Sequence, residues 1–324
     1  MSQLDYAKDL MNFYGKRGQA FLFIVDFDCK KPIVIRLEET SKNQILFDIH
    51  GFTNAVARDN VYKILRFQKA PIPFHVYKKA FDLVQHHISD GNTYLLNLTT
   101  ATRIETNYSL SDLFFHSTAK FKLLYKNSFV VFSPEIFIRI EGSTISSFPM
   151  KGTIDAALPQ AEQRILQDEK EKAEHATIVD LIRNDLSIIA SNVAVEQYRY
   201  IDRIRTNDKE LLQVSSKITG HLEGNYLERI GDILFQLLPA GSVSGAPKKK
   251  TIEIIKEAEQ YDRGYYTGVF GYFNGSRLES GVMIRFIENI DGTYVYKSGG
   301  GITAYSNLES EYQEMVDKVY VPLG

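Results

Sequence analysis

Short runs rich in β-branched and aromatic residues recur along most of the chain and predict strands. Many of these runs are bounded by glycine, asparagine or aspartate, which favour turns. Segments with a helical spacing of apolar residues lie among them in no regular order. The predicted strands are 21–27, 32–37, 93–103, 128–140, 268–273, 278–288 and 293–298, and the predicted helices are 76–89, 169–189, 226–238, 248–261 and 308–321.

This irregular mixture favours an α+β fold with large, mostly antiparallel sheets, because a doubly wound sheet requires strands and helices to alternate. No internal repeat, low-complexity linker or compositional break divides the 324 residues. We therefore expect residues 1–324 to form a single catalytic domain.

Composition narrows the class of partner without naming a function. The chain has 38 basic and 40 acidic residues, which gives no electrostatic reason to expect nucleic acid or an anionic membrane as partner. It has no signal peptide and no run of ~20 apolar residues, so we expect a cytoplasmic protein that acts on a small molecule. Cys29 is the only cysteine, which excludes an intrachain disulfide and a cysteine metal cluster.

A lysine stands between a proline and a glycine in Pro149-Met150-Lys151-Gly152-Thr153. Taken alone, this motif is more typical of an exposed hairpin tip than of a reactive group. A lysine amine becomes a nucleophile when burial or a neighbouring charge lowers its pKa. The other motifs decide between these two interpretations.

Two predicted helices carry glutamates in a matching arrangement. Glu171 and Glu174 lie three residues apart in one helix, and Glu311 and Glu314 lie three apart in the other. Residues three apart share a helix face, and a solvated surface explains either pair alone. If the two faces meet, however, their carboxylates suit Mg²⁺, which prefers oxygen ligands and keeps positions open for water and an anionic substrate.

Two glycine-rich stretches have no nucleotide-binding pattern. The segment 241–248 lacks the Gly-Lys-Ser/Thr ending of a phosphate loop, so a nucleotide loop is not expected there. The segment 299–301 lacks the spacing of a dinucleotide fingerprint. Its glycines indicate either a close approach of the backbone to a ligand carboxylate or a tight turn.

Taken together and in order, these motifs resemble those of the chorismate-utilising enzymes. The resemblance runs from about residue 90 to the C-terminus and implies the fold of anthranilate synthase component I, a sandwich of large, mostly antiparallel sheets flanked by helices. It also implies a shortened N-terminal region, which gives no support for a regulatory tryptophan pocket. The motifs that carry it are Ser133-Pro134-Glu135, 149–153, 173–175 with 179–185, 241–248, 299–302 and 311–314.

Lys151 distinguishes subgroups within the family, since the anthranilate synthases have alanine at this position. The chain therefore most resembles aminodeoxychorismate synthase component I, an amino-group transferase of 4-aminobenzoate and folate biosynthesis. The resemblance implies chorismate as substrate, Lys151 as nucleophile and Glu135 as general acid and base. It also implies substrate contacts at Thr153, Gly245, Tyr266, Arg285, Gly300 and Lys318, and a Mg²⁺ site with Glu174 and Glu314 as direct ligands and Glu171 and Glu311 acting through water.

Two positions depart from the family pattern. Leu95 stands where ammonia-using members have glutamine and water-using members have a lysine base, and leucine cannot activate water. This argues against isochorismate or salicylate formation. Gln213 stands at the position of a family histidine; it can form hydrogen bonds but cannot donate a proton as an acid.

The source of ammonia is expected to lie outside the chain. Cys29 lacks the glycine-flanked elbow and the histidine base of a glutaminase nucleophile. We therefore expect a separate glutamine amidotransferase subunit, or free ammonia, as the nitrogen source. Two alternatives stay open: anthranilate synthase component I, and a non-catalytic protein with the chorismate-binding fold.

Overall fold

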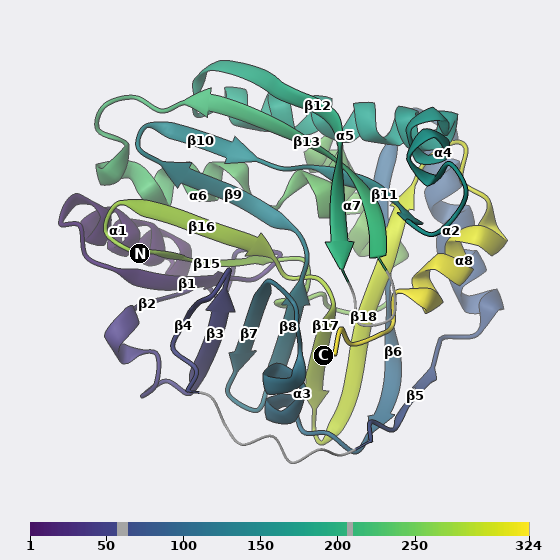
Figure 1. The fold of residues 1–324 in the computed structure, drawn as a ribbon, viewed down its shortest axis with the longest axis horizontal. Coiled ribbons are helices and arrows are strands. Elements are labelled where there is room, and N and C mark those ends of the chain that lie inside the picture. The colour runs from purple at the N-terminus through teal and green to yellow at the C-terminus, as the bar shows by residue number, and fades with distance from the viewer. Residues whose placement is uncertain (57–63, 206–209, 324) are drawn as a thin grey trace.

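Two nine-stranded antiparallel sheets dominate the computed structural model, which describes residues 1–56, 64–205 and 210–323 (Figure 1). In the first sheet, β12 pairs with β13 off the main path of strands. The order along that path is β11 (Met150–Asp155), β13 (Glu210–His221), β10 (Thr144–Ser147), β9 (Ile136–Glu141), β16 (Arg277–Val282), β15 (Val269–Phe273), β1 (Phe21–Val25) and β2 (Ile33–Arg36), and β12 spans Ser191–Arg205.

The second sheet contains the glycine-rich strand β18, which pairs with β6 over residues 294–302. A short strand, β5, also pairs with β6. The order is β14 (Gly245–Ala246), β6 (Leu95–Thr106), β18 (Thr293–Ile302), β17 (Phe286–Ile290), β8 (Phe129–Ser133), β7 (Phe121–Tyr125), β3 (Ile45–Ile49) and β4 (Phe52–Thr53), and β5 spans Phe67–Ala70.

Helices cover the outer faces of both sheets (Figure 1). One hydrophobic cluster joins α1, α5 and α6 to the first sheet, and another joins α2, α7 and α8 to the second. None of the described helices is long and apolar enough to cross a membrane. The helices are α1 (Gln3–Lys16), α2 (Phe74–Ser89), α3 (Leu110–His116), α4 (Ala161–Gln167), α5 (Glu169–Ser187), α6 (Ile230–Leu237), α7 (Lys248–Ala258) and α8 (Leu308–Asp317), with 3₁₀ turns η1 (Leu37–Glu39), η2 (Tyr226–Arg229) and η3 (Gly241–Val243).

Strand β1 shows how the layers are held together. Every residue of its Phe-Leu-Phe-Ile-Val sequence is buried. Side chains alternate between the two faces of a strand. Phe21, Phe23 and Val25 accordingly join the cluster under the helices, while Leu22 and Ile24 join the cluster between the sheets. A strand buried on both faces needs a continuous apolar run, and this packing confirms the predicted α+β sandwich flanked by helices.

The chain crosses between the sheets at two short connections that the sequence pattern had merged into single strands. The predicted strand 128–140 is β8 of the second sheet followed by β9 of the first. Pro134 lies between them and has no N–H for a sheet hydrogen bond, which ends the strand. The predicted strand 278–288 likewise divides into β16 and β17, with residues 283–285 between.

Other sequence predictions are also corrected. Residues 299–301 lie inside β18, so the tight-turn interpretation is wrong. The predicted helix 226–238 is a 3₁₀ turn followed by α6. The long β12–β13 hairpin was not predicted, because polar and charged residues interrupt the apolar pattern of both strands. The single-domain assignment stays a prediction.

A buried carboxylate on a central strand of the first sheet contacts two arginines and a histidine. Glu279 on β16 is 1% exposed and accepts hydrogen bonds or ion pairs from His50 at 2.9 Å, Arg139 at 2.5 Å and Arg277 at 3.0 Å. Burial alone opposes ionisation, but these partners outweigh it and lower the pKa of Glu279 to about 2. The ionised form is therefore the one that stabilises the fold.

We expect the Glu279→Gln substitution to lower the free energy of unfolding at pH 7 by about 3 kcal/mol, from the depressed pKa at 1.36 kcal/mol per unit. Because the folded pKa lies below the ordinary value of 4.5, this stabilisation is complete above pH ~4.5 and disappears as the pH falls towards 2. Urea denaturation at pH 7 and at pH 3 measures the difference. Equal losses at both pH values would contradict the assignment, and exposed Glu162 supplies the Glu→Gln control.

Candidate active site

A cavity of about 520 Å³ lies where the two sheets meet α5 and α8. A volume of this size suits a small organic ligand. The structure brings all the candidate site residues from the sequence to its wall, although their roles stay predictions. They are Glu135, Lys151, Thr153, Glu171, Glu174, Gly245, Tyr266, Arg285, Gly300, Glu311, Glu314 and Lys318.

A bulge in β11 sets the direction of Lys151. The pairing of β11 with β13 shifts between Lys151 and Thr153, and Gly152 between them has a φ of +78°. A side chain at this position is strained by that φ, and its Cβ would lie 3.1 Å from a carboxylate oxygen of Glu171. The glycine therefore allows both the bulge and the close approach of α5, while Thr153 stays exposed at the cavity rim.

Lys151 lies beside Glu174, with 3.0 Å between Nζ and Oε2. Burial acts to lower the pKa of Lys151, but the carboxylate of Glu174, with smaller effects from Glu314 and Glu171, raises it above its ordinary value. A nucleophilic lysine is expected to have a lowered pKa, and in the metal-free structure the pKa of Lys151 is raised instead. A free amine requires the carboxylates to be neutralised by another cation.

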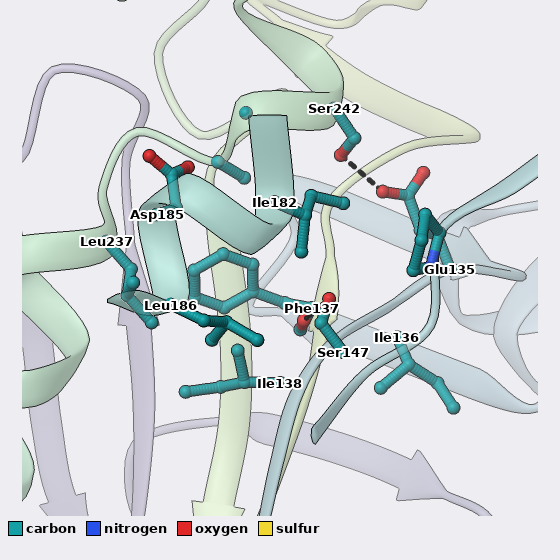
Figure 2. Close-up of a pocket in the computed structure, with 13 residues that line it drawn as sticks. Glu135, Ile136, Phe137, Ile138, Ser147, Ile182, Asp185, Leu186, Leu237 and Ser242 are labelled. Carbon is teal, nitrogen blue, oxygen red and sulfur yellow. Dashed lines mark hydrogen bonds between the residues drawn. The ribbon is translucent and has the colours of Figure 1, made fainter. Parts of the chain in front are cut away.

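Glu135 occupies the first connection between the sheets, directly after Pro134. Figure 2 shows its carboxyl group facing Ser242 of η3, which donates a short hydrogen bond to it. Ile182 and Phe137 line the small apolar pocket on the same side. Burial raises the pKa of Glu135, while the hydrogen bond from Ser242 acts in the opposite direction. This environment favours a protonated carboxyl group able to act as an acid.

Arg285 occupies the second connection, and its guanidinium group lies in the cavity wall over the ring of Tyr320, 5.1 Å from the ring centroid. In the described part of the chain no carboxylate lies within 4.0 Å of this guanidinium, and its Nε is buried without a hydrogen-bond partner. Tyr266 lines the same wall and is buried. A half-buried guanidinium that lacks a carboxylate partner marks a place for an anionic ligand.

The two glutamate-bearing helices face each other, as the metal hypothesis requires. Asp168 caps α5 by accepting a hydrogen bond from the N–H of Glu171, and Asn307 caps α8 in the same way. Lys170 bridges the helices, since its Nζ lies 3.7 Å from Glu174 and 3.5 Å from Glu311.

Glycines bring the backbone close to this carboxylate cluster. A Cβ at Gly300 would lie 3.4 Å from an oxygen of Glu311 and an oxygen of Glu314, within ordinary contact. Lys318 follows α8, and its Nζ donates to Glu314 at 2.6 Å and to the carbonyl oxygen of Gly299 at 3.0 Å. On β14, which pairs with the other edge of β6, Gly245 has a φ of +137°, and a Cβ there would lie 1.9 Å from the carbonyl oxygen of Leu95.

The donor set fits a hard divalent cation by its chemistry, since it consists of carboxylate oxygens. Burial raises the pKa values of Glu171 and Glu311, with neighbouring carboxylates adding to the effect, and the nearby lysines offset this only in part. Among the residues that the structure describes, however, no three such side chains are arranged around one point as metal ligands. Lysine ammonium groups pair with them instead.

Two residues of the site were not predicted from the sequence. Ser242 is the second residue of the glycine-rich segment 241–248, and its place in that segment is the only feature of the sequence that points to it. Lys170 lies four residues before Glu174, a spacing that places it on the same helix face. Leu95 and Gln213, the two departures from the family pattern, also line the cavity.

The sequence of this chain is similar to those of several known proteins. A family model described as chorismate binding enzyme matches residues 37–324. A curated "Uncharacterized PabA-like protein" of Haemophilus influenzae is 48% identical over 322 residues, covering 99% of this chain and 98% of that protein. A protein of the same description from Pasteurella multocida is 49% identical over 314 residues, covering 97% of each. Anthranilate synthase component 1 of Archaeoglobus fulgidus is 30% identical over 75% of this chain and 60% of that protein.

Solved structures share the fold. The menaquinone-specific isochorismate synthase of Escherichia coli superposes with a TM-score of 0.74 at 17% identity, covering 98% of this chain and 81% of that one. Anthranilate synthase component I of Streptococcus pneumoniae superposes with a TM-score of 0.65 at 26% identity, covering 79% of this chain and 58% of that one. Because the family model extends from residue 37 to the end of the sequence, this chain belongs to the family of chorismate-binding enzymes.

Proposed function

We propose that this protein is component I of an aminodeoxychorismate synthase, which converts chorismate and ammonia to 4-amino-4-deoxychorismate. One observation carries the proposal: Lys151, the residue that separates this subgroup from the anthranilate synthases, lines the cavity together with a half-buried acid, Glu135, and an arginine, Arg285, that has no carboxylate partner among the described residues. A cationic side chain on an exposed hairpin tip would have no such surroundings.

In this mechanism the free amine of Lys151 attacks C2 of the chorismate ring. The new C–N bond forms as the ring double bonds shift and the C4–O bond breaks, so the C4 hydroxyl leaves. Ammonia then attacks C4, the double bonds shift back, and the bond to Lys151 breaks. The pyruvyl ether stays in place throughout, in contrast to anthranilate formation.

Glu135 supplies the proton that the leaving hydroxyl needs, because hydroxide is a poor leaving group. Its raised pKa, caused by burial, supports this role. When the hydroxyl leaves as water, Glu135 becomes a carboxylate that accepts hydrogen bonds from Ser242. It then takes a proton from the incoming ammonium product, which restores the acid.

Replacing Ser242 with alanine is expected to shift the alkaline limb of the pH profile to higher pH. The hydroxyl of Ser242 acts to lower the pKa of Glu135, so its loss raises that pKa and keeps the acid protonated over a wider range. Profiles of kcat/KM for wild type, Ser242→Ala and Ser242→Thr measure the shift, with threonine retaining a hydroxyl. An unmoved limb, or one at lower pH, would contradict the role of Glu135.

The two carboxylates of chorismate match the charges of the cavity. Arg285 offers a planar guanidinium to one of them, with Tyr266 and the backbone near Gly300 beside it. Lys318 lies beside Glu314, one of the glutamates proposed to hold the metal. A bound Mg²⁺, held by Glu174 and Glu314 with Glu171 and Glu311 around it, would neutralise the glutamates that keep Lys151 protonated and orient the ring carboxylate.

The nitrogen source is proposed to be a separate glutamine amidotransferase subunit. Burial and the nearby carboxylates of Asp26 and Asp28 raise the pKa of the Cys29 thiol to about 12. Such a thiol stays protonated at neutral pH and is a poor nucleophile for glutamine. Release of 4-aminobenzoate, for folate biosynthesis, then falls to a separate lyase.

Incubation with chorismate, MgCl₂ and an ammonium salt tests the proposal. We expect 4-amino-4-deoxychorismate, identified by its mass and ultraviolet spectrum, and no product when glutamine replaces ammonium. Anthranilate as the main product would assign the chain to the anthranilate synthases, whose curated members are among its relatives. Isochorismate as the main product would also overturn the proposal, and so would glutamate released from glutamine by the chain alone.

A further inference from the structure

The carboxylate cluster between α5 and α8 holds a lysine that the proposed mechanism does not use. Lys170 lies in the first turn of α5, and its Nζ reaches one carboxylate of each helix, Glu174 at 3.7 Å and Glu311 at 3.5 Å. Glu311 is itself fixed by a 2.7 Å hydrogen bond from Ser306. The ammonium of Lys170 thus occupies the space between two of the side chains assigned to the metal.

The charges of the cluster support an exchange of cations. Its glutamates, together with the ammonium groups of Lys151, Lys170 and Lys318, leave a net charge of about −1, so the cluster is nearly balanced without a metal. A divalent cation added to all three lysines would leave an excess positive charge. The net charge becomes zero if one ammonium group leaves or loses its proton as the metal enters, and Lys170 is the lysine whose ammonium group lies between carboxylates of both helices.

Of the three lysines, Lys170 is the one placed to leave. Its side chain is 44% exposed, compared with 25% for Lys151 and 28% for Lys318. Its two contacts are also longer than the 3.0 Å and 2.6 Å contacts of the other lysines. A long flexible side chain at the rim of a cavity can rotate into water at low cost.

We propose that Lys170 is an internal counter-ion that fills the metal position, and that Mg²⁺ binds only by displacing its ammonium group into solvent. Lys170 thereby keeps α5 and α8 together in the metal-free protein and sets the concentration of Mg²⁺ needed to load the site. The inference rests on the proposed function for the identity of the metal site, but it concerns cation binding and not the reaction.

Calorimetric titration of Mg²⁺ into the purified full-length protein, without chorismate, tests the exchange. Because two surface-type ion pairs contribute up to about 2 kcal/mol, Lys170→Met is expected to bind Mg²⁺ about fivefold to thirtyfold more tightly than wild type. Lys172→Met is the matched control, since Lys172 lies on the same helix and pairs with Glu169. It should bind as wild type does.

A second measurement needs no variant and covers the case in which Lys170→Met fails to fold. Pulse acetylation with mass-spectrometric readout should modify Lys170 faster when Mg²⁺ is added, while Lys172 in the same peptide is unchanged. Equal or weaker Mg²⁺ binding by Lys170→Met, or protection of Lys170 by Mg²⁺, would overturn the proposal. Absence of Mg²⁺ binding in both proteins would also overturn it. None of these results depends on which product the chorismate assay yields.

Discussion

Lys151→Ala is expected to lower the rate of chorismate amination at C4 by at least about 10³-fold, the scale on which loss of a covalent nucleophile acts. No other lysine should take over the reaction, because Lys151 is the only lysine of the described cavity that lies at the bulge of β11. Steady-state assays with ammonium measure the rate. Mass spectra of intact protein mixed with chorismate should show an adduct in wild type and none in the variant.

Two controls separate a chemical defect from a structural one. Lys172→Ala, on the exposed face of α5, should retain wild-type activity. Calorimetric titration with chorismate should show that Lys151→Ala still binds substrate, since Arg285 and the carboxylate cluster are intact. Full amination by Lys151→Ala would rule out the nucleophile, and loss of binding together with activity would assign Lys151 to substrate binding.

Arg285→Met is expected to lower kcat/KM for chorismate by about 10²- to 10³-fold, because one member of a buried, hydrogen-bonded charge pair contributes about 2–5 kcal/mol. Most of the loss should appear in KM, since a carboxylate remote from the breaking bond is held equally in the ground and transition states. Steady-state kinetics over a wide range of chorismate concentrations measure both parameters. Arg183→Met, a surface substitution on α5, is the control.

Thermal stability distinguishes this role from a structural one. In the absence of ligand Arg285 has no carboxylate partner within 4.0 Å among the described residues, so its half-buried charge is a cost to the fold. Methionine has a similar length and no charge. The variant should therefore keep or exceed the wild-type Tm while losing activity, and a large fall in Tm would indicate that Arg285 mainly supports the fold.

Much of the fold was predictable because both faces of several strands are buried, as in β1, and apolar runs then stand out. The β12–β13 hairpin, whose strands mix polar and apolar residues, carries no such signal. Strands β8 and β9 merged in the prediction because the pattern on each side of Pro134 is equally apolar. Which sheet receives a strand depends on long-range pairing that local sequence does not encode.

The residues of the site could be predicted from the order of the motifs along the chain, and every candidate residue lines one cavity. What could not be predicted depends on contacts between elements far apart in the chain. The bridge from Lys170 to Glu311 requires α5 and α8 to face each other. The direction of the pKa shift of Lys151 cannot be predicted without the distance to Glu174, because burial and the carboxylate act on that pKa in opposite directions.

The two crossings between the sheets also bear on how the enzyme forms. Glu135 and Arg285 lie on connections whose geometry exists only after both sheets have paired and docked. Folds dominated by such long-range pairings form slowly, and partly folded states of chains this size retain local structure without complete packing. Regain of activity should therefore come after regain of secondary structure on refolding, so that turnover reports completion of the native state.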